Sequence, residues 1–116
     1  MRWIGVIALL LPGLALAGPW EGVWSADPAW CDRADRIGSV TPAPIRLTAS
    51  TLEGYENTCQ IGEIEQVGEL PAFRLGLTCT AEGSTYDEDL LILWTTSDTL
   101  WQFSGSEPVQ FFRCTP

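Results

Sequence analysis

The sequence predicts an all-β, mainly antiparallel fold in which about seven short strands form a meander sheet that curls into a small barrel. Phe73, Leu75, Leu77 and Cys79 alternate with polar residues or glycine, which is the period of a half-buried strand. Glycine, proline, aspartate and serine recur between the apolar stretches, where tight turns are expected. One short N-terminal helix and two disulfides complete the predicted fold.

The N-terminus has the pattern of a secretory signal peptide. Arg2 precedes an almost unbroken apolar run over residues 3–16, and an Ala-x-Ala cleavage signal ends at Ala17. The run is too short for a membrane-spanning helix, and no second apolar stretch of spanning length follows it. We therefore expect residues 1–17 to be cleaved and residues 18–116 to form one β-barrel-like domain in the periplasm or outside the cell, without membrane insertion.

The first elements of this domain are a strand and a helix. Residues 20–24 form the predicted first strand. Asp27 is a favourable N-cap and Pro28 fits the first helical position, so a short amphipathic helix is predicted over residues 28–37. Gly38 provides its end.

A long hairpin over residues 52–82 is the centre of the predicted sheet. Gly68 and Pro71 supply the reversal between its two arms. Folding the arms about this turn puts Cys59 opposite Cys79 on adjacent strands. We therefore expect a cross-strand disulfide between these two cysteines.

The remaining strands are predicted from apolar segments that lie between turns. In the first arm of the hairpin, Tyr55 and Asn57 interrupt the alternation, so a β-bulge is expected near Gly54. The other predicted strands are residues 45–48, 85–94, 100–104 and 109–114. Pairing of the first strand with the last would close the sheet and remove its exposed edges.

The four cysteines indicate two structural disulfides. An even number of cysteines in a small exported domain is typical of a disulfide framework. Once Cys59 and Cys79 are paired, elimination leaves a bridge between Cys31 and Cys114. A zinc site is the alternative, but the sequence has no histidine and no CxxC spacing, and we expect no metal.

The chain is strongly acidic and contains no lysine and no histidine. Removal of the signal peptide takes away Arg2 and leaves five arginines against fifteen acidic residues, a net charge of −10. Nucleic acids and anionic membranes select for basic surfaces, so neither is an expected partner. A basic protein is the partner class that such a surface would attract.

The composition also argues against catalysis. A serine or threonine nucleophile needs a histidine or lysine as its base, and both residue types are absent. The cysteines are assigned to disulfides. We therefore expect no enzyme activity and no cofactor.

The densest acidic cluster is Asp87-Glu88-Asp89. On a strand, Asp87 and Asp89 share a face, where paired carboxylates could bind a sugar or Ca²⁺. The alternative is that these charges protect a strand end from pairing with another molecule. We favour the second interpretation because no second acidic cluster and no calcium-loop spacing supports the first.

Aromatic residues supply the rest of the candidate partner surface. Trp24 and Trp94 are predicted to lie in the core, and Trp20 and Trp101 at the barrel rim, because a small domain seldom hides all its indoles. The candidate partner surface consists of Trp20, Trp101, Tyr55, Asp87 and Asp89.

Gly22-Val23-Trp24 resembles the G-x-W motif on the first strand of lipocalin-like barrels. In that superfamily the tryptophan lies at the closed end of the barrel and an arginine of the last strand packs over it. Arg113 matches that arginine, so the resemblance implies a barrel closed by Trp24 and Arg113. Small exported bacterial metalloprotease inhibitors and lysozyme inhibitors are similar barrels.

The chain also departs from these inhibitors. The mature chain is expected to begin close to Trp20, so it lacks the N-terminal tail that metalloprotease inhibitors insert into the protease cleft. The loop motifs of lysozyme inhibitors are absent as well. The resemblance therefore implies the fold and leaves the activity open.

Two functional hypotheses follow from these observations. The first is an exported, non-catalytic binding module of the cell envelope, which acts as a monomer and inhibits a basic secreted or periplasmic enzyme. The alternative is a carrier of lipocalin type that holds a small apolar ligand inside the barrel. Large side chains would fill the lumen of so small a barrel, which favours the binding module.

Overall fold

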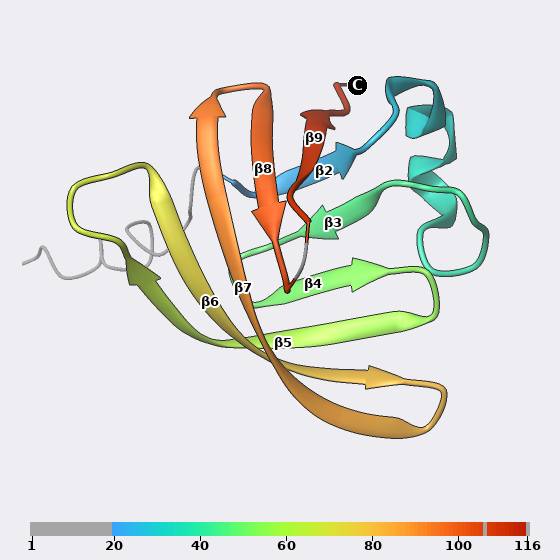
Figure 1. Cartoon of the computed structure of the whole chain (residues 1–116). Coiled ribbons are helices and arrows are strands. Elements are labelled where there is room, and N and C mark those ends of the chain that lie inside the picture. Colours follow the sequence, from blue (N-terminus) through green and yellow to red (C-terminus); the bar gives the residue numbers. More distant parts are fainter. Residues whose placement is uncertain (1–19, 106, 116) are drawn as a thin grey trace, which may run out of the picture.

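The computed structural model describes residues 20–105 and 107–115, which form a closed antiparallel barrel (Figure 1). Neighbouring strands follow one another in sequence order, and the last strand pairs with the first to close the barrel. The strands are β2 (Gly22–Ser25), β3 (Ile45–Leu47), β4 (Thr51–Gly54), β5 (Asn57–Gln66), β6 (Ala72–Ala81), β7 (Ser84–Thr96), β8 (Thr99–Phe103) and β9 (Val109–Arg113). The predicted fold class is confirmed, whereas the proposed signal peptide over residues 1–17 lies outside the described residues.

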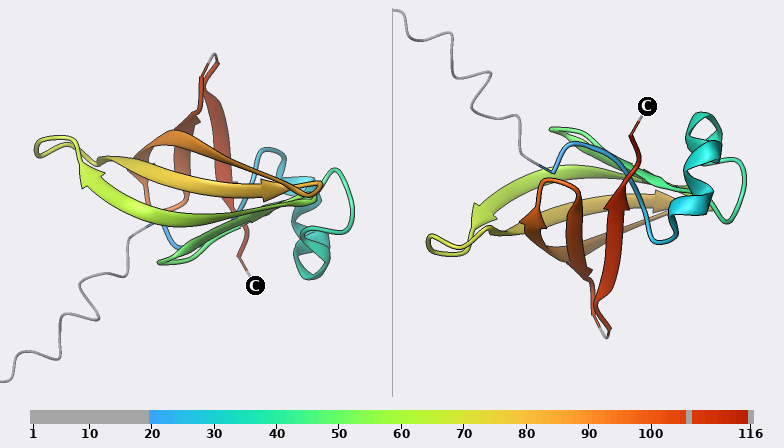
Figure 2. Two further views of the ribbon diagram at one scale, coloured as in Figure 1. Left: turned by 90° about the horizontal axis from the view of Figure 1, so that it is seen from below. Right: turned by 90° about the horizontal axis from the view of Figure 1, so that it is seen from above.

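The N-terminal helix η2 (Pro28–Arg36) lies at one end of the barrel (Figures 1 and 2). The Asp27 side chain accepts a hydrogen bond of 3.0 Å from the backbone nitrogen of Ala29, as expected of an N-cap. The helix is of the 3₁₀ type, with non-helical dihedral angles at Arg33. The sequence predicted the helix itself and its N-cap, but not this tighter winding.

The first arm of the predicted long hairpin is two strands rather than one. Residues 55 and 56 form a tight turn between β4 and β5, with Glu56 in the left-handed region at φ 49°. This turn adds the eighth strand to the barrel. The bulge expected near Gly54 is therefore wrong: the irregularity in the ladder lies between Ile61 and Glu63, at Gly62.

The hairpin of β5 and β6 has the predicted register at its centre. Cys59 lies opposite Cys79 with their Cα atoms 3.9 Å apart, and Ile61 lies opposite Leu77. Cys59 and Cys79 form a disulfide. Strands β5, β6 and β7 are longer than the others, so the β5–β6 and β6–β7 hairpins extend away from the barrel in opposite directions (Figures 1 and 2).

Large side chains fill the interior of the barrel. Trp24, Leu75, Ile92 and Leu100 are each fully buried. Trp20, predicted at the rim, is only 3% exposed and belongs to this core. The chain before β2 turns inward, so that the Trp20 ring packs against Phe73 and the Trp20 carbonyl accepts a hydrogen bond from Trp24 Nε1.

Arg113 lies over Trp24 at the point where β9 meets β2. The two residues are partners in the ladder, and the guanidinium carbon lies 4.3 Å from the centroid of the indole. Arg113 also donates hydrogen bonds to the carbonyls of Glu21 (2.8 Å) and Ser97 (2.7 Å). Gly22 permits this arrangement, because a Cβ there would lie 2.6 Å from a guanidinium nitrogen of Arg113.

A second disulfide holds the C-terminal end of the described chain against the seam, which is the pairing of β2 with β9 that closes the barrel. Cys31 in η2 is bonded to Cys114, directly after β9, and the backbone nitrogen of Cys114 donates to the Val23 carbonyl. Both predicted disulfide pairings are therefore confirmed. Among the described residues, no helix has the length and apolar character needed to cross a bilayer.

Candidate functional site

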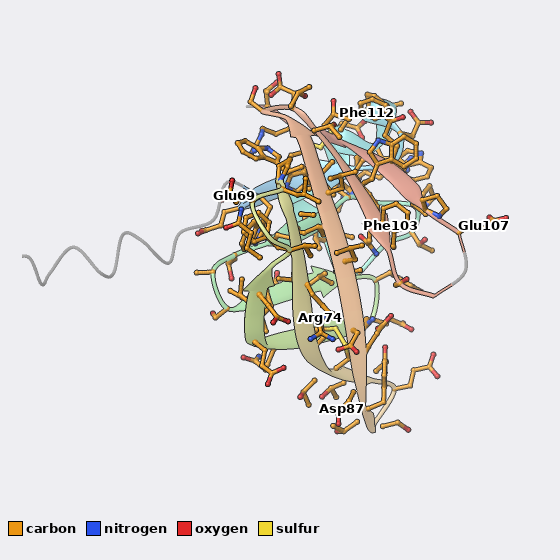
Figure 3. All side chains as sticks on the ribbon, turned by 60° about the vertical axis from the view of Figure 1, so that its left-hand side comes forward. Glu69, Arg74, Asp87, Phe103, Glu107 and Phe112 are labelled. Carbon is orange, nitrogen blue, oxygen red and sulfur yellow. A yellow bond between two sulfur atoms is a disulfide. The ribbon has the colours of Figure 1, made fainter. Side chains whose placement is uncertain are left out.

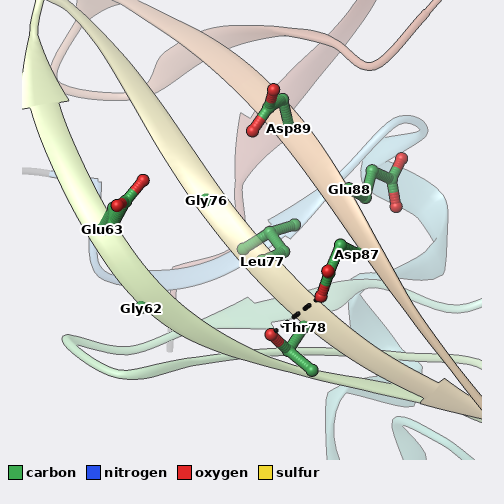
Figure 4. Close-up of a pocket in the computed structure, with 8 residues that line it drawn as sticks. All are labelled: Gly62, Glu63, Gly76, Leu77, Thr78, Asp87, Glu88 and Asp89. Atoms are coloured by element: carbon green, nitrogen blue, oxygen red, sulfur yellow. Dashed lines mark hydrogen bonds between the residues drawn. The ribbon is translucent and has the colours of Figure 1, made fainter.

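A shallow groove of about 280 Å³ crosses the outer face of β5, β6 and β7 (Figure 4). This face is set by the alternation along β6: Leu75, Leu77 and Cys79 are buried, whereas Arg74 and Thr78 are exposed on the other side. The residues that line the groove are Gly62, Glu63, Gly76, Leu77, Thr78, Asp87, Glu88 and Asp89. Four of these eight residues are acidic, so the groove has a negative electrostatic potential.

Gly76 gives the groove its shape. An added Cβ at this position would lie 3.1 Å from Glu63 Oε1 and 3.3 Å from Glu63 Cβ. The absence of a side chain on β6 therefore lets Glu63 lie across that strand. Asp89 is the ladder partner of Gly76 on the other side, so Gly76 separates Glu63 from Asp89.

The two aspartates of β7 lie on the same face, as the sequence predicted. Asp87 is the ladder partner of Thr78, whose hydroxyl donates a hydrogen bond of 3.2 Å to Asp87 Oδ1 (Figure 4). Glu88 projects from the opposite face, where its Oε1 lies 4.0 Å from Cys79 Sγ. The cluster is thus divided between the two faces of β7.

Arg74 is the basic residue of this face (Figure 3). Its guanidinium donates to Glu65 Oε1 at 2.7 Å, and this ion pair is exposed. The hydrogen bond and charge of Glu65 raise the pKa of Arg74, and the charges of Asp89 and Glu63 raise it further. Arg74 therefore offsets only part of the negative potential of the groove.

The three carboxylates on the outer face of the groove are outside the ion pairs of the described residues, and so is Glu88 on the opposite face. Within residues 20–105 and 107–115, the ion pairs join Arg46 to Glu53, Arg74 to Glu65 and Arg113 to Asp98. None of them includes the carboxylates of Glu63, Asp87 and Asp89. In the described part of the chain, no group of histidine, cysteine, aspartate and glutamate side chains is arranged to hold a metal ion.

The structure does not bring the five predicted surface residues together. Asp87 and Asp89 line the groove, but Tyr55 is 47% exposed on the β4–β5 turn and Trp101 is half-buried on β8. The assignment of Trp20 to a surface is wrong, because this side chain is in the core. Of the five predicted surface residues, Asp87 and Asp89 are thus the two that line the groove.

Glu63 is the groove residue that sequence reasoning missed. Extending the register of Cys59 opposite Cys79 without interruption would put Glu63 opposite Leu75, on the buried face. The bulge at Gly62 shifts the ladder, so that Glu63 pairs with Gly76 and faces outward. Gly62 itself could have indicated the shift in register, since glycine inside a strand pattern suggests a bulge.

Comparison of the sequence with protein-family models and with curated proteins, and of the fold with solved structures, found no match.

Proposed function

We propose that this protein is an exported, non-catalytic binding module of the cell envelope, and that its groove on β5, β6 and β7 binds a basic protein. The observation that carries this proposal is the set of unpaired carboxylates of Glu63, Asp87 and Asp89 along the groove. These residues lie on paired strands of a barrel with two disulfides, so their backbone is already ordered and loses little conformational entropy on binding. The net charge of −10 expected after removal of the signal peptide, from five arginines against fifteen acidic residues, would speed the approach of a cationic partner.

A basic secreted or periplasmic enzyme, inhibited by the bound module, is the partner that we propose. The module itself lacks lysine and histidine, and its four cysteines are in disulfides, which leaves no cysteine nucleophile and no nucleophile activated by histidine or lysine. Disulfides are compatible with an oxidising compartment outside the cytoplasm. An exported enzyme would share that compartment.

The carrier alternative has less support. A carrier needs space inside the barrel, and here Trp24, Leu75, Ile92 and Leu100 occupy the interior. The groove lies on the outer face, and half of its lining residues are acidic, which suits a cation better than an apolar ligand. We therefore put forward no second function.

The test compares three forms of the full protein as bait for the exported proteins of the source organism. One is the wild type, the second carries Glu63→Gln, Asp87→Asn and Asp89→Asn, and the charge-matched control carries Asp32→Asn, Asp35→Asn and Glu107→Gln. A sodium chloride gradient elutes the captured proteins. The captured enzyme is then purified, and its affinity and its inhibition are measured with each form.

We expect the wild type and the charge-matched control to bind and inhibit the same basic enzyme. The groove variant should bind it about tenfold more weakly or worse, because cationic side chains would lose their counter-charges. Equally weakened binding by the groove variant and the charge-matched control would show that net charge, and not the groove, attracts the partner. Binding of the groove variant as tight as that of the wild type would contradict the proposed site. The absence of any inhibited enzyme would contradict the proposed function.

A further inference from the structure

One edge of the long central strands has no neighbouring strand. β7 pairs with β6 in a continuous register from Ser84 to Leu93, but its pairing with β8 begins only at Leu91. Along residues 84–90, the ladder partners within the described chain are therefore all on one side. Figure 1 shows this part of β7 beyond the ends of β8 and β9, in the arm that leads to the β6–β7 turn.

An unpaired edge is able to accept a further strand. In an antiparallel sheet the backbone N–H and C=O groups of alternate residues point to opposite sides of each strand. Half of those in residues 84–90 therefore point away from β6, to the side where no strand of the described chain pairs with them. An extended peptide can pair with them in a ladder of hydrogen bonds, a common form of peptide recognition.

The side chains along this edge select a basic occupant. Asp87 and Asp89 project on the outer face, and Tyr86, which is 40% exposed, lies beside them in the sequence. Side chains of an added strand lie about 5 Å from those directly opposite, within reach of an ion pair. Arginine or lysine at alternate positions of the added strand would thus contact both aspartates. Two copies of this edge would bring like charges together, so a second copy of the chain is a poor occupant.

A similar edge on β5 is less suitable. Beyond Ile61, β5 has lost its pairing with β4, so residues 62–66 are also paired on one side. The bulge at Gly62 disturbs the straight ladder that an added strand requires. Glu65 on this segment is already paired with Arg74.

We propose that the free edge of β7, residues 84–90, binds an extended segment of the basic partner as an additional strand, with basic side chains at alternate positions beside Asp87 and Asp89. This inference rests on the proposed function and specifies where and in what conformation the partner binds. The groove next to this edge would then receive the basic side chains.

The test uses synthetic peptides of about seven residues, long enough to cover the edge. In the probe peptide, arginine alternates with threonine and both ends are blocked. The control peptide has the same side chains but carries N-methyl groups along its backbone, so it keeps the charge and loses the hydrogen bonds of a strand. Affinity for the full protein and hydrogen exchange of each backbone amide are measured by NMR.

The probe peptide should slow the exchange of alternate amides in residues 84–90, and the N-methylated peptide should bind about tenfold more weakly or worse. Asp87→Asn with Asp89→Asn should also weaken the probe peptide, whereas the matched pair Asp32→Asn with Asp35→Asn should not. Equal binding of both peptides, unchanged exchange in residues 84–90, or no binding at all would overturn the added strand. Equal binding of both peptides or unchanged exchange would leave the proposed function intact, because a basic ligand would still bind. The capture experiment described above tests that function separately.

Discussion

At the scale of single residues, Gly22 determines how the barrel closes. Its φ of +142° is unfavourable for any other residue, and the missing side chain leaves space for the guanidinium of Arg113. Arg113 then covers Trp24 and binds the Glu21 carbonyl. Both residues of the G-x-W pattern thus take part in the contact with Arg113: Gly22 leaves space for the guanidinium, and Trp24 packs beneath it.

Replacing Gly22 by alanine should destabilise the protein by about 2–4 kcal/mol, because backbone strain adds to the displacement of Arg113. Gly105→Ala is the matched control: Gly105 has a similar φ of +138°, but nothing lies within 4 Å of an added Cβ. Its cost should be about 1–2 kcal/mol, from backbone strain alone. Urea unfolding followed by tryptophan fluorescence measures both, and equal losses would contradict the role given to Arg113.

At the scale of strands, the acidic cluster occupies the part of β7 that has no partner strand on one side. Asp87-Glu88-Asp89 lies within residues 84–90, before the pairing with β8 begins. Charged residues on an open edge discourage the sheets of two molecules from joining. The same charges can therefore repel a second copy and attract a basic strand.

Removing the two outward charges should permit self-association. We expect Asp87→Asn with Asp89→Asn to form dimers or larger species at concentrations where the wild type is a monomer. Asp32→Asn with Asp35→Asn on η2 removes the same charge from a place far from the edge in sequence and should remain monomeric. Sedimentation velocity distinguishes monomers from larger species. Association of both variants would show that net charge alone prevents association.

The seam between β2 and β9 is short, with Trp24 opposite Arg113 and Ser25 opposite Phe112, and only the β3–β4 pairing among the described strands has as few residue pairs. The Cys31–Cys114 disulfide adjoins it. Replacing both of these cysteines by serine should cost about 4 kcal/mol, the chain-entropy value for so long a loop. The exchange of the amide at position 114, which donates to the Val23 carbonyl across the seam, should accelerate more than that of amides at the centre of β6.

The matched control for that prediction replaces Cys59 and Cys79 by serine. This pair closes a loop with a sequence separation of 20, compared with 83 for the other bridge. Its loss should accelerate exchange in β5 and β6 first and leave the seam less affected. Uniform acceleration across the barrel in both variants would contradict a local role for the Cys31–Cys114 bridge.

Much of the strand pattern could be predicted because it depends on local alternation and on turn residues. The Cys59–Cys79 pairing followed from counting along two arms of one hairpin. The turn between β4 and β5 was missed because Tyr55 and Glu56 are not typical turn residues, although Glu56 adopts a positive φ. One irregular residue, Gly62, reverses which face a side chain occupies, and counting alone does not reveal this for Glu63.

At the scale of the whole molecule, repulsion among acidic groups opposes the compact state. All fifteen acidic residues lie in the described part of the chain, where five arginines accompany them. Such a charge excess keeps a protein soluble but lowers its stability.

The position of Trp20 is also a property of the whole molecule, since its burial depends on where β6 places Phe73. Local sequence patterns do not contain that information.

Salt should therefore stabilise the folded protein at neutral pH. Raising the ionic strength from about 0.01 M to about 0.15 M shortens the screening length from about 30 Å to about 8 Å. We expect a gain on the order of 1 kcal/mol, visible as a rise in Tm of about 4–8 °C. Near pH 4.1, the isoelectric point of the sequence, the effect should vanish. A fall in Tm with salt at pH 7 would show that attractive ion pairs outweigh the repulsion.

The bridge between Cys31 and Cys114 also determines how the molecule would carry tension. Strands β3 to β9 lie within the covalent loop that this disulfide closes, and β2 precedes it. Force applied to the chain before β2 and to the chain after Cys114 would first separate β2 from β3 and β9, its neighbours in the barrel. Once β2 is detached, the force would pass through the two sulfur atoms, and the long strands that carry the groove would bear none of it.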